Sequence, residues 1–233
     1  MTNEAASYHG YRFPPEIISH AVWLYHRFCL SFRDTEDLLA QRGITVSYEA
    51  IRQWCQRFGP ESARILRRRQ GRLGDTGHLD ELFVNIQGRQ QYLWRAVDQD
   101  GDVIDILVQP RRDRHAAERF FRKLLKAQGR APRRLITDKL RSYSAAHGLV
   151  MPAVVHSTQQ HENHRAEVSH QPTCQRERQM RRFKSTAHAQ RFLSVHGLVR
   201  NLFRVGRHLL RAAHHRGLRT RSFLVWNDVT GTC

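Results

Sequence analysis

The spacing of hydrophobic residues along this 233-residue chain changes from a helical to a strand-like period near residue 78. Before that point, apolar side chains recur every three or four positions after Pro14 and Pro15, at Ile17, Ile18, Ala21, Val22, Tyr25 and Phe28, which predicts a helix. After it, apolar and polar side chains alternate at Leu82, Val84 and Ile86, which predicts a strand. The pattern therefore predicts a helical N-terminal part followed by a part that contains a sheet.

Two further helices are predicted in the N-terminal part. Ser31 and Asp34 have the spacing of a capping box before TEDLLAQR, and Gly43 ends that helix. Ser47 can cap the next helix, whose apolar positions are Ile51, Trp54, Cys55 and Phe58 and whose other face carries Arg52, Gln53, Gln56 and Arg57. Arg and Gln side chains pair with guanine and adenine edges. This layout is typical of a helix-turn-helix, in which the second helix enters the major groove. Three packed helices with an ordinary polar face are the alternative.

Residues 78–138 predict a mixed sheet. HLDELFVNIQG, QYLWRAVD and VIDILVQ are strand-like, with Gly88 at the first turn and an Asp-Gly hairpin in DQDGD (98–102). RHAAERFFRKLLKAQG predicts a helix that ends at Gly129, and RRLITD is a short apolar strand that ends at Asp138. Three antiparallel strands, a helix and another strand place this part in the α/β class, with helices flanking the sheet. Beyond residue 157 the chain is helical and rich in Arg.

Breaks in these patterns predict the domain boundaries. Gly59 and Pro60 indicate the end of the third helix, and the run RRRQGR (67–72) indicates a linker. We expect an all-α helix-turn-helix domain at 1–66, a basic linker at 67–77, an α/β domain at 78–205 and a basic helical extension at 206–233.

The charge of the chain indicates a polyanionic partner. It contains 39 Lys and Arg against 21 Asp and Glu, a formal net charge of +18, and 35 of the basic residues are Arg. Arg grips phosphate bidentately, so nucleic acid is the expected partner. No run approaches the ~18 apolar residues that span a bilayer, the N-terminus has no signal-peptide pattern, and the four Cys show no paired spacing. We therefore expect a cytoplasmic protein with reduced thiols and no membrane partner.

Two carboxylates occupy unusual positions on the predicted strands. Asp80 shares the parity of the apolar positions on the first strand, and Asp138 ends an apolar strand, where sites collect in open α/β sheets. Buried carboxylates need a cation, and Mg²⁺ or Mn²⁺ takes oxygen ligands. A third carboxylate would come from Glu162, Glu167, Glu177 or Asp228, of which Glu167 is favoured because Asn163, His170 and Gln171 share its helix face. Each carboxylate taken alone could instead be a surface partner of a nearby Arg.

The residues carry a resemblance to a known family. HLDELFVNIQGRQQYLWRAVDQDGDVIDILVQPRRDRHAAERFFRKLL, RLITDKLRSY, NHRAEVSHQPT, RERQMRRFKS, YEAIRQWCQRFG and HLLRAAHHRGLRTRSFLVWNDVT are similar to bacterial insertion-sequence transposases with a DDE triad, the IS-six family. The resemblance covers roughly residues 8–230. It implies an RNase H-like catalytic domain with Asp80, Asp138 and Glu167 as the metal-binding triad and Mg²⁺ as cofactor, with Mn²⁺ as substitute. It also implies that a multimeric synaptic complex acts on the terminal inverted repeats and joins them to target DNA.

Basic residues near the expected triad are candidates for holding DNA. In addition to the face of the third helix, they are Lys139, Arg141, Arg165, Arg176, Arg178, Arg181, Arg182 and Lys184. The chain departs from the family pattern at Gly77, His164 and Val168, so the alternative function is a catalytically decayed copy that binds specific DNA without cleaving it. Other readings are a DNA-binding regulator, a nuclease that hydrolyses without joining strands, and a zinc site built from His156, His161, His164, His170 and Cys174.

Overall fold

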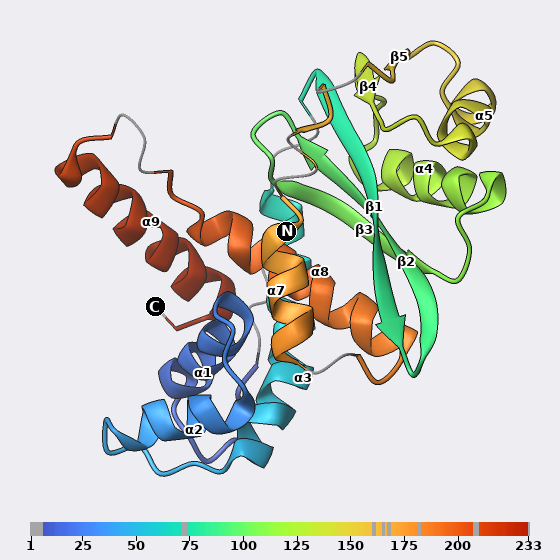
Figure 1. The fold of residues 1–233 in the computed structure, drawn as a ribbon. Coiled ribbons are helices and arrows are strands. Elements are labelled where there is room, and N and C mark those ends of the chain that lie inside the picture. The colour runs from blue at the N-terminus through green and yellow to red at the C-terminus, as the bar shows by residue number, and fades with distance from the viewer. Residues whose placement is uncertain are drawn as a thin grey trace. The chain divides into compact units, whose positions relative to one another are not determined.

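The computed structural model describes residues 7–70, 74–159, 162–164, 166, 169–180, 183–206 and 210–232. The chain divides into two compact units, each described here by itself. The helical unit consists of Met1–Arg69 and Ser194–Cys233, and the sheet unit consists of Gln70–Leu193. Helix α8 (Thr186–Phe203) begins in the sheet unit and ends in the helical unit (Figure 1).

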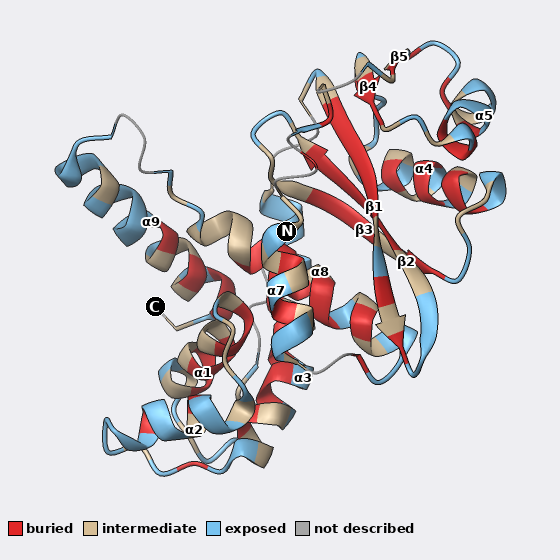
Figure 2. Cartoon of the chain, in the orientation of Figure 1, coloured by how far each residue is buried: buried red, intermediate tan, exposed pale blue. Residues whose placement is uncertain are grey.

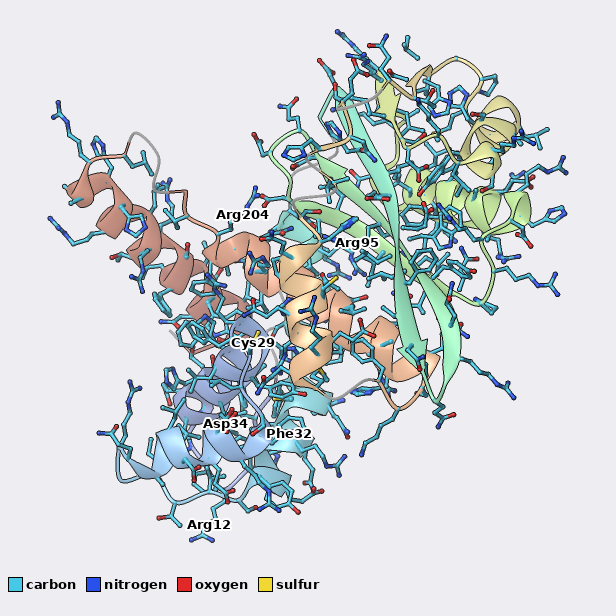
Figure 3. The ribbon with its side chains drawn as sticks, viewed as in Figure 1. Arg12, Cys29, Phe32, Asp34, Arg95 and Arg204 are labelled. Carbon is cyan, nitrogen blue, oxygen red and sulfur yellow. The ribbon has the colours of Figure 1, made fainter. Side chains whose placement is uncertain are left out.

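The helical unit contains α1 (Pro15–Arg27), α2 (Phe32–Ala40), α3 (Tyr48–Arg69) and α9 (Ala212–Thr230). The capping box that the sequence predicts is confirmed, because the Ser31 hydroxyl accepts from the Asp34 N–H at 3.0 Å and an Asp34 oxygen accepts from the Ser31 N–H at 2.7 Å. The Ser47 hydroxyl likewise accepts from the Ala50 N–H at 3.3 Å. Phe32, labelled with Asp34 on α2 in Figure 3, stacks on Tyr25 of α1 with ring centroids 4.1 Å apart. The caps satisfy backbone N–H groups at the starts of α2 and α3, and the stacked pair packs α2 against α1.

Helix α3 does not end at Gly59, so that prediction is wrong. The helix continues through Gly59 and Pro60 to Arg69. An internal proline removes one helical hydrogen bond at a cost of ~3 kcal/mol, and here buried side chains on both sides of Pro60, among them Phe58 and Leu66, offset that cost. A Cβ added to Gly59 would lie 2.9 Å from Nε2 of His26, so the glycine permits a close approach between α3 and α1.

The sheet unit is built on a five-stranded mixed sheet in the order β3-β2-β1-β4-β5. Its strands are β1 (Thr76–Ile86), β2 (Arg89–Asp98), β3 (Val103–Gln109), β4 (Arg134–Ile136) and β5 (Val155–Ser157). The first three strands pair antiparallel, whereas β4 pairs parallel with both β1 and β5. Helices α4 (Arg114–Gln128), α5 (Arg141–Val150) and α7 (Gln171–Gln179) complete the unit. The predicted α/β class, with a mixed sheet and flanking helices, is confirmed.

One face of the sheet packs against α4 and α5 in a core rich in aromatic side chains. Trp94 of β2 meets Tyr143 of α5 edge-to-face, with ring centroids 5.3 Å apart, and Phe120 and Phe121 of α4 are fully buried in the same cluster. Figure 2 shows this buried surface along the strands and on the inner side of α4. The opposite face carries Asp80, Val84 and the other even-numbered positions of β1, because side chains alternate along a strand. A rigid sheet with a packed core thus supports the residues on β1.

No helix within the described part of the chain is long and apolar enough to cross a membrane.

Candidate active site

Asp80 and Asp138 meet where β4 stops pairing with β1. The last paired residues are His78 and Ile136, so the edge of β1 that faces β4 is open directly beyond that point, and its next backbone bridge is the one between Ile86 and Phe183. Asp138 lies two residues after Ile136 and is therefore level with Asp80 across the sheet. Carboxylate oxygens of Asp80, Glu81 and Asp138 all lie within 4.8 Å of one another. The structure thus brings together the two aspartates that the sequence singled out and adds a third carboxylate.

Glu81 joins this cluster from the other face of the strand. It shares the parity of Leu79 and lies opposite Trp94 in β2, on the face that α4 and α5 cover. Its side chain is only 1% exposed. Strand alternation placed Glu81 away from Asp80, and the open edge of β1 is what allows the longer glutamate side chain to reach the same point. A carboxylate directly after Asp80 in an apolar strand was the signal in the sequence that could have identified it.

The carboxylate cluster is short of positive charge. Burial, together with the nearby charge of Asp138, raises the pKa of Glu81 to about 7. Burial also raises the pKa of Asp138, and the neighbouring Asp80 adds to that effect, although the Leu140 N–H donates to Asp138 and opposes it. Both shifts mean that burial, with a smaller contribution from the neighbouring carboxylates, disfavours the ionised forms. A divalent cation would remove this conflict, and a donor set made only of carboxylate oxygens suits Mg²⁺ or Mn²⁺.

Three basic or amide side chains surround Asp80. His170 Nε2 lies 2.8 Å from an Asp80 oxygen, and Asn163 donates to the Leu79 carbonyl at 2.8 Å. Arg95, labelled in Figure 3, is opposite Asp80 in the β1–β2 register, is 3% exposed and donates to the Ser169 carbonyl at 3.0 Å. Asn163 and His170 are thereby attached to β1, and Ser169 is attached to β2.

A fourth side chain, Arg112, connects two of the carboxylates. Its guanidinium forms an ion pair with Glu81 and lies 3.5 Å from Asp138. Arg112 follows β3 and precedes α4, and sequence reasoning did not single it out.

Glu167 itself, like Val168, lies outside the described residues. The other acidic residues that were considered for the third position have partners elsewhere. Glu162 pairs with Arg134 at 2.7 Å, a Glu177 oxygen accepts from the Asn85 N–H at 3.2 Å, and Asp228 pairs with Arg69 in the helical unit. These contacts explain Glu162, Glu177 and Asp228 without a catalytic role.

The predicted DNA-binding face of α3 is largely solvent-exposed. Gln53, Gln56 and Arg57 are exposed, while Arg52 is partly exposed and pairs with Glu49, 2.8 Å from Nε to the carboxylate. Hydrogen bonds from Arg52 and then Gln53 lower the pKa of Glu49 to about 2, so Glu49 stays ionised and holds Arg52. In the sheet unit, the exposed candidates are Lys139, Arg141, Arg178 and Lys184.

Arg176 is an exception among the predicted DNA contacts. It is fully buried, and its guanidinium carbon lies 5.1 Å from the ring centroid of Phe192. A side chain in this position cannot reach a DNA phosphate, so the prediction for Arg176 is wrong. The density of basic residues around position 176 predicted an exposed DNA contact, but a guanidinium can be buried when it stacks on an aromatic ring. Arg165, Arg181 and Arg182 lie outside the described residues.

The histidines do not build a zinc site in the described part of the chain. His156 is hydrogen-bonded to the Thr137 hydroxyl at 2.9 Å and stacks on His147, whereas His170 contacts Asp80. The only described group of side chains close enough to hold a metal is the carboxylate cluster of Asp80, Glu81 and Asp138. His161 is not among the described residues.

Comparison with known proteins identifies the family to which this chain belongs. A family model described as a DDE domain matches residues 74–206, which span the whole carboxylate cluster. The chain is 31% identical over 164 residues to the transposase for insertion sequence-like element IS431mec of Staphylococcus aureus, covering 68% of this chain and 73% of that protein. The chain belongs to the IS-six family of DDE transposases. The transposase for insertion sequence element IS257 in transposon Tn4003 of the same organism is equally similar, with 31% identity over 164 residues.

The similarity of this transposase to one solved viral intasome is distant. The simian T-cell lymphotropic virus intasome in complex with a PP2A regulatory subunit aligns with 64% of this chain and 56% of its own chain, at 13% identity and a TM-score of 0.40. The assignment therefore depends on the family match and on the relatives with 31% identity. Family membership supports a DNA-processing enzyme that uses divalent metal ions, and the carboxylate cluster lies inside the matched domain.

Proposed function

We propose that this transposase binds the terminal inverted repeats of its insertion sequence and catalyses metal-dependent DNA cleavage and strand transfer. The observation that carries the proposal is the convergence of Asp80, Glu81 and Asp138 within 4.8 Å at the open edge of β1. Metal-assisted phosphodiester chemistry requires negative oxygen ligands, and this cluster lies inside the matched DDE domain.

Asp80 and Asp138 are proposed as two of the metal ligands, with Mg²⁺ as the cofactor and Mn²⁺ as its substitute. A bound divalent ion supplies Lewis-acid chemistry, activating a water or a 3′-hydroxyl and stabilising the leaving oxygen. The protein's part is to hold the carboxylates: Asp80 lies on the central strand, and the Leu140 N–H orients Asp138 from 2.9 Å.

Glu167 is proposed as the third member of the triad. Support comes from its described neighbours in sequence, because Asn163 and His170 lie on either side of it and contact Leu79 and Asp80. Glu167 is four residues after Asn163 and three residues before His170, which contacts Asp80.

DNA binding is proposed to use both units. Arg52, Gln53, Gln56 and Arg57 on α3 would contact base edges as the recognition helix of a helix-turn-helix. Phosphate contacts near the carboxylates would come from the exposed side chains of Lys139, Arg141, Arg178 and Lys184. Arg165, Arg181 and Arg182 lie outside the described residues and are added from the sequence alone. Element ends must be brought together before joining, so we propose that the active form is a homo-oligomer in a synaptic complex with target DNA.

Two of the positions that depart from the family pattern are described in the structure. Gly77 is paired with Asp98 in β2 and with Leu135 in β4, so a glycine there leaves β1 continuous. His164 is exposed. Neither position therefore favours the alternative, a decayed copy that only binds DNA.

A strand-transfer assay tests the proposal. Purified protein is incubated with labelled DNA carrying the inverted-repeat ends, in Mg²⁺, Mn²⁺ or EDTA, as wild type and as Asp80→Asn, Asp138→Asn and Glu167→Gln. We expect joined product in both metals, none in EDTA and none from the three variants, all of which should still bind the ends. Binding without product from the wild type in either metal would instead establish the decayed copy.

A further inference from the structure

Arg112 brings a permanent positive charge into the carboxylate cluster. Its Nη2 atom contacts both Glu81 and, at 3.5 Å, Asp138. Arg112 thus partly offsets the negative charges of Glu81 and Asp138.

The two contacts of Arg112 differ in strength. Glu81 is almost completely buried, with 1% of its side chain exposed, whereas the Asp138 side chain is 37% exposed. Charge pairs are screened much more by water at an exposed site than at a buried one. Glu81 is therefore the anchor of Arg112, and Asp138 is the contact that can be exchanged.

Surrounding groups keep the guanidinium at this point. Its carbon lies 5.6 Å from the centroid of the Phe83 ring, which provides a cation–π contact. Ser142 donates to the backbone carbonyl of Arg112 at 3.5 Å. One third of the Arg112 side chain remains exposed, so it can move without unfolding the core.

We propose that Arg112 is a resident counter-cation of the carboxylate cluster, and that a divalent metal must displace it from Asp138 in order to bind. This inference rests on the proposed function, because it takes Asp138 to be a metal ligand. A guanidinium and a divalent ion on the same carboxylate repel each other, so Arg112 lowers the affinity of the site for metal. Arg112 acts as a positioning residue that sets metal occupancy through Asp138.

Direct metal binding tests this inference without any DNA or turnover. Free Mn²⁺ is titrated against the full-length protein and followed by its electron paramagnetic resonance signal. For Arg112→Gln, which removes the charge, we expect Mn²⁺ to bind roughly three- to tenfold more tightly than in wild type. Arg111→Gln is the matched control, because Arg111 is the adjacent arginine, its side chain is 78% exposed and it lies 4.0 Å from Asp113; its affinity should equal that of wild type.

The sign of the change separates this role from a structural one. A merely structural arginine would weaken Mn²⁺ binding when replaced, so unchanged or weaker binding by Arg112→Gln overturns the inference. If Arg112→Gln does not fold, Arg112→Lys is used instead. Lys keeps the charge but lacks the fork that contacts two carboxylates, so the Mn²⁺ affinity of this variant should equal or exceed that of wild type. Weaker Mn²⁺ binding by Arg112→Lys overturns the inference.

Asp138→Asn distinguishes failure of the inference from failure of the proposed function. If Asp138→Asn binds Mn²⁺ as well as wild type does, Asp138 is not a metal ligand and the proposed site is wrong. If Asp138→Asn loses Mn²⁺ and Arg112→Gln does not gain affinity, only the role of Arg112 is wrong.

Discussion

His170 Nε2 lies 2.8 Å from an Asp80 oxygen, although the two residues are far apart in the sequence. Asn163 makes the neighbouring contact, donating to the Leu79 carbonyl at 2.8 Å. Both contacts attach one stretch of chain to β1 at the carboxylate cluster. Since the proposed third ligand, Glu167, lies between Asn163 and His170 in sequence, these contacts are expected to support the site without being part of the chemistry.

Replacing His170 tests that expectation. His170→Ala removes the contact with Asp80 and should lower strand transfer by about tenfold, the loss of ~1.4 kcal/mol of transition-state stabilisation. The measurement is product yield per unit time with labelled element ends, with circular dichroism to verify the fold. His115→Ala on α4 is the control, since His115 is exposed. Equal activity of the two variants would show that His170 does not support the site.

Replacing a base-reading side chain tests the role of α3. Arg57→Ala removes an exposed guanidinium from the helix face and should weaken binding to the inverted repeats by ~1–3 kcal/mol. Fluorescence anisotropy with element-end DNA and with a scrambled duplex measures affinity and specificity. Because the contact reads sequence, binding to scrambled DNA should change far less.

The control for α3 is an arginine of the other unit. Arg122→Ala on α4 removes the same charge from another exposed position and should affect the two duplexes equally. If Arg57→Ala also weakens both duplexes equally, the third helix does not recognise sequence.

Replacing two helical glycines, Gly59 and Gly148, by alanine tests the close approach of α3 to α1. Alanine normally stabilises a helix interior by ~1 kcal/mol relative to glycine. At Gly148 of α5 an added Cβ meets nothing within 4 Å, so Gly148→Ala should raise the free energy of unfolding by about that amount. At Gly59 the Cβ would lie 2.9 Å from buried His26, so Gly59→Ala should lower it instead. Urea denaturation measures both, and stabilisation by Gly59→Ala would show that the approach has room for a methyl group.

The stability of the protein should depend on pH through His188. Burial, with smaller contributions from Arg191 and Lys184, lowers the pKa of His188 in the folded chain. The unfolded chain then takes up the proton at higher pH than the folded chain does. The contribution of neutral His188 to the free energy of unfolding is therefore fully present above about pH 6.5, the ordinary pKa of histidine. It is lost as the pH falls toward and through the lower pKa that His188 has in the folded chain.

Replacing His188 should flatten this part of the pH profile. Asn can accept the hydrogen bond that His188 Nδ1 accepts from the Lys184 N–H at 3.3 Å, but it does not titrate. We expect His188→Asn to lose less stability than wild type between pH 7.5 and pH 5.5 in urea denaturation. An identical loss in both proteins would mean that His188 does not contribute.

Much of the fold could be predicted because its causes are local. The Ser31–Asp34 capping box and the glycine turn at Gly88, with φ of 77°, involve residues adjacent in sequence. Periodicity likewise predicted the first three strands and α4. The helix end expected at Gly59 failed for the opposite reason: glycine and proline favour a break locally, but the buried contacts of α3 with other helices outweigh that preference.

The site could be predicted in part. Asp80 and Asp138 were recognisable because a carboxylate in an apolar strand is costly without a partner. Glu81 was missed because strict alternation assigns it to the other face, and Arg112 because nothing in a loop arginine shows which carboxylate it will meet. Arg176 was misassigned since its burial against Phe192 depends on the packing of α7 and α8.

The sequence by itself determined the helices and strands, their caps and turns, the basic character of the chain and its resemblance to a transposase family. These follow from hydrogen bonds and side-chain patterns within a few residues, or from composition. Only the tertiary structure decided that β4 stops pairing with β1 at Ile136 and that Glu81 and Arg112 thereby join the aspartates. The reason is physical. These charged groups come from distant parts of the chain, and the distance between them depends on where each strand ends and on how its neighbours pack. No local sequence pattern encodes that distance.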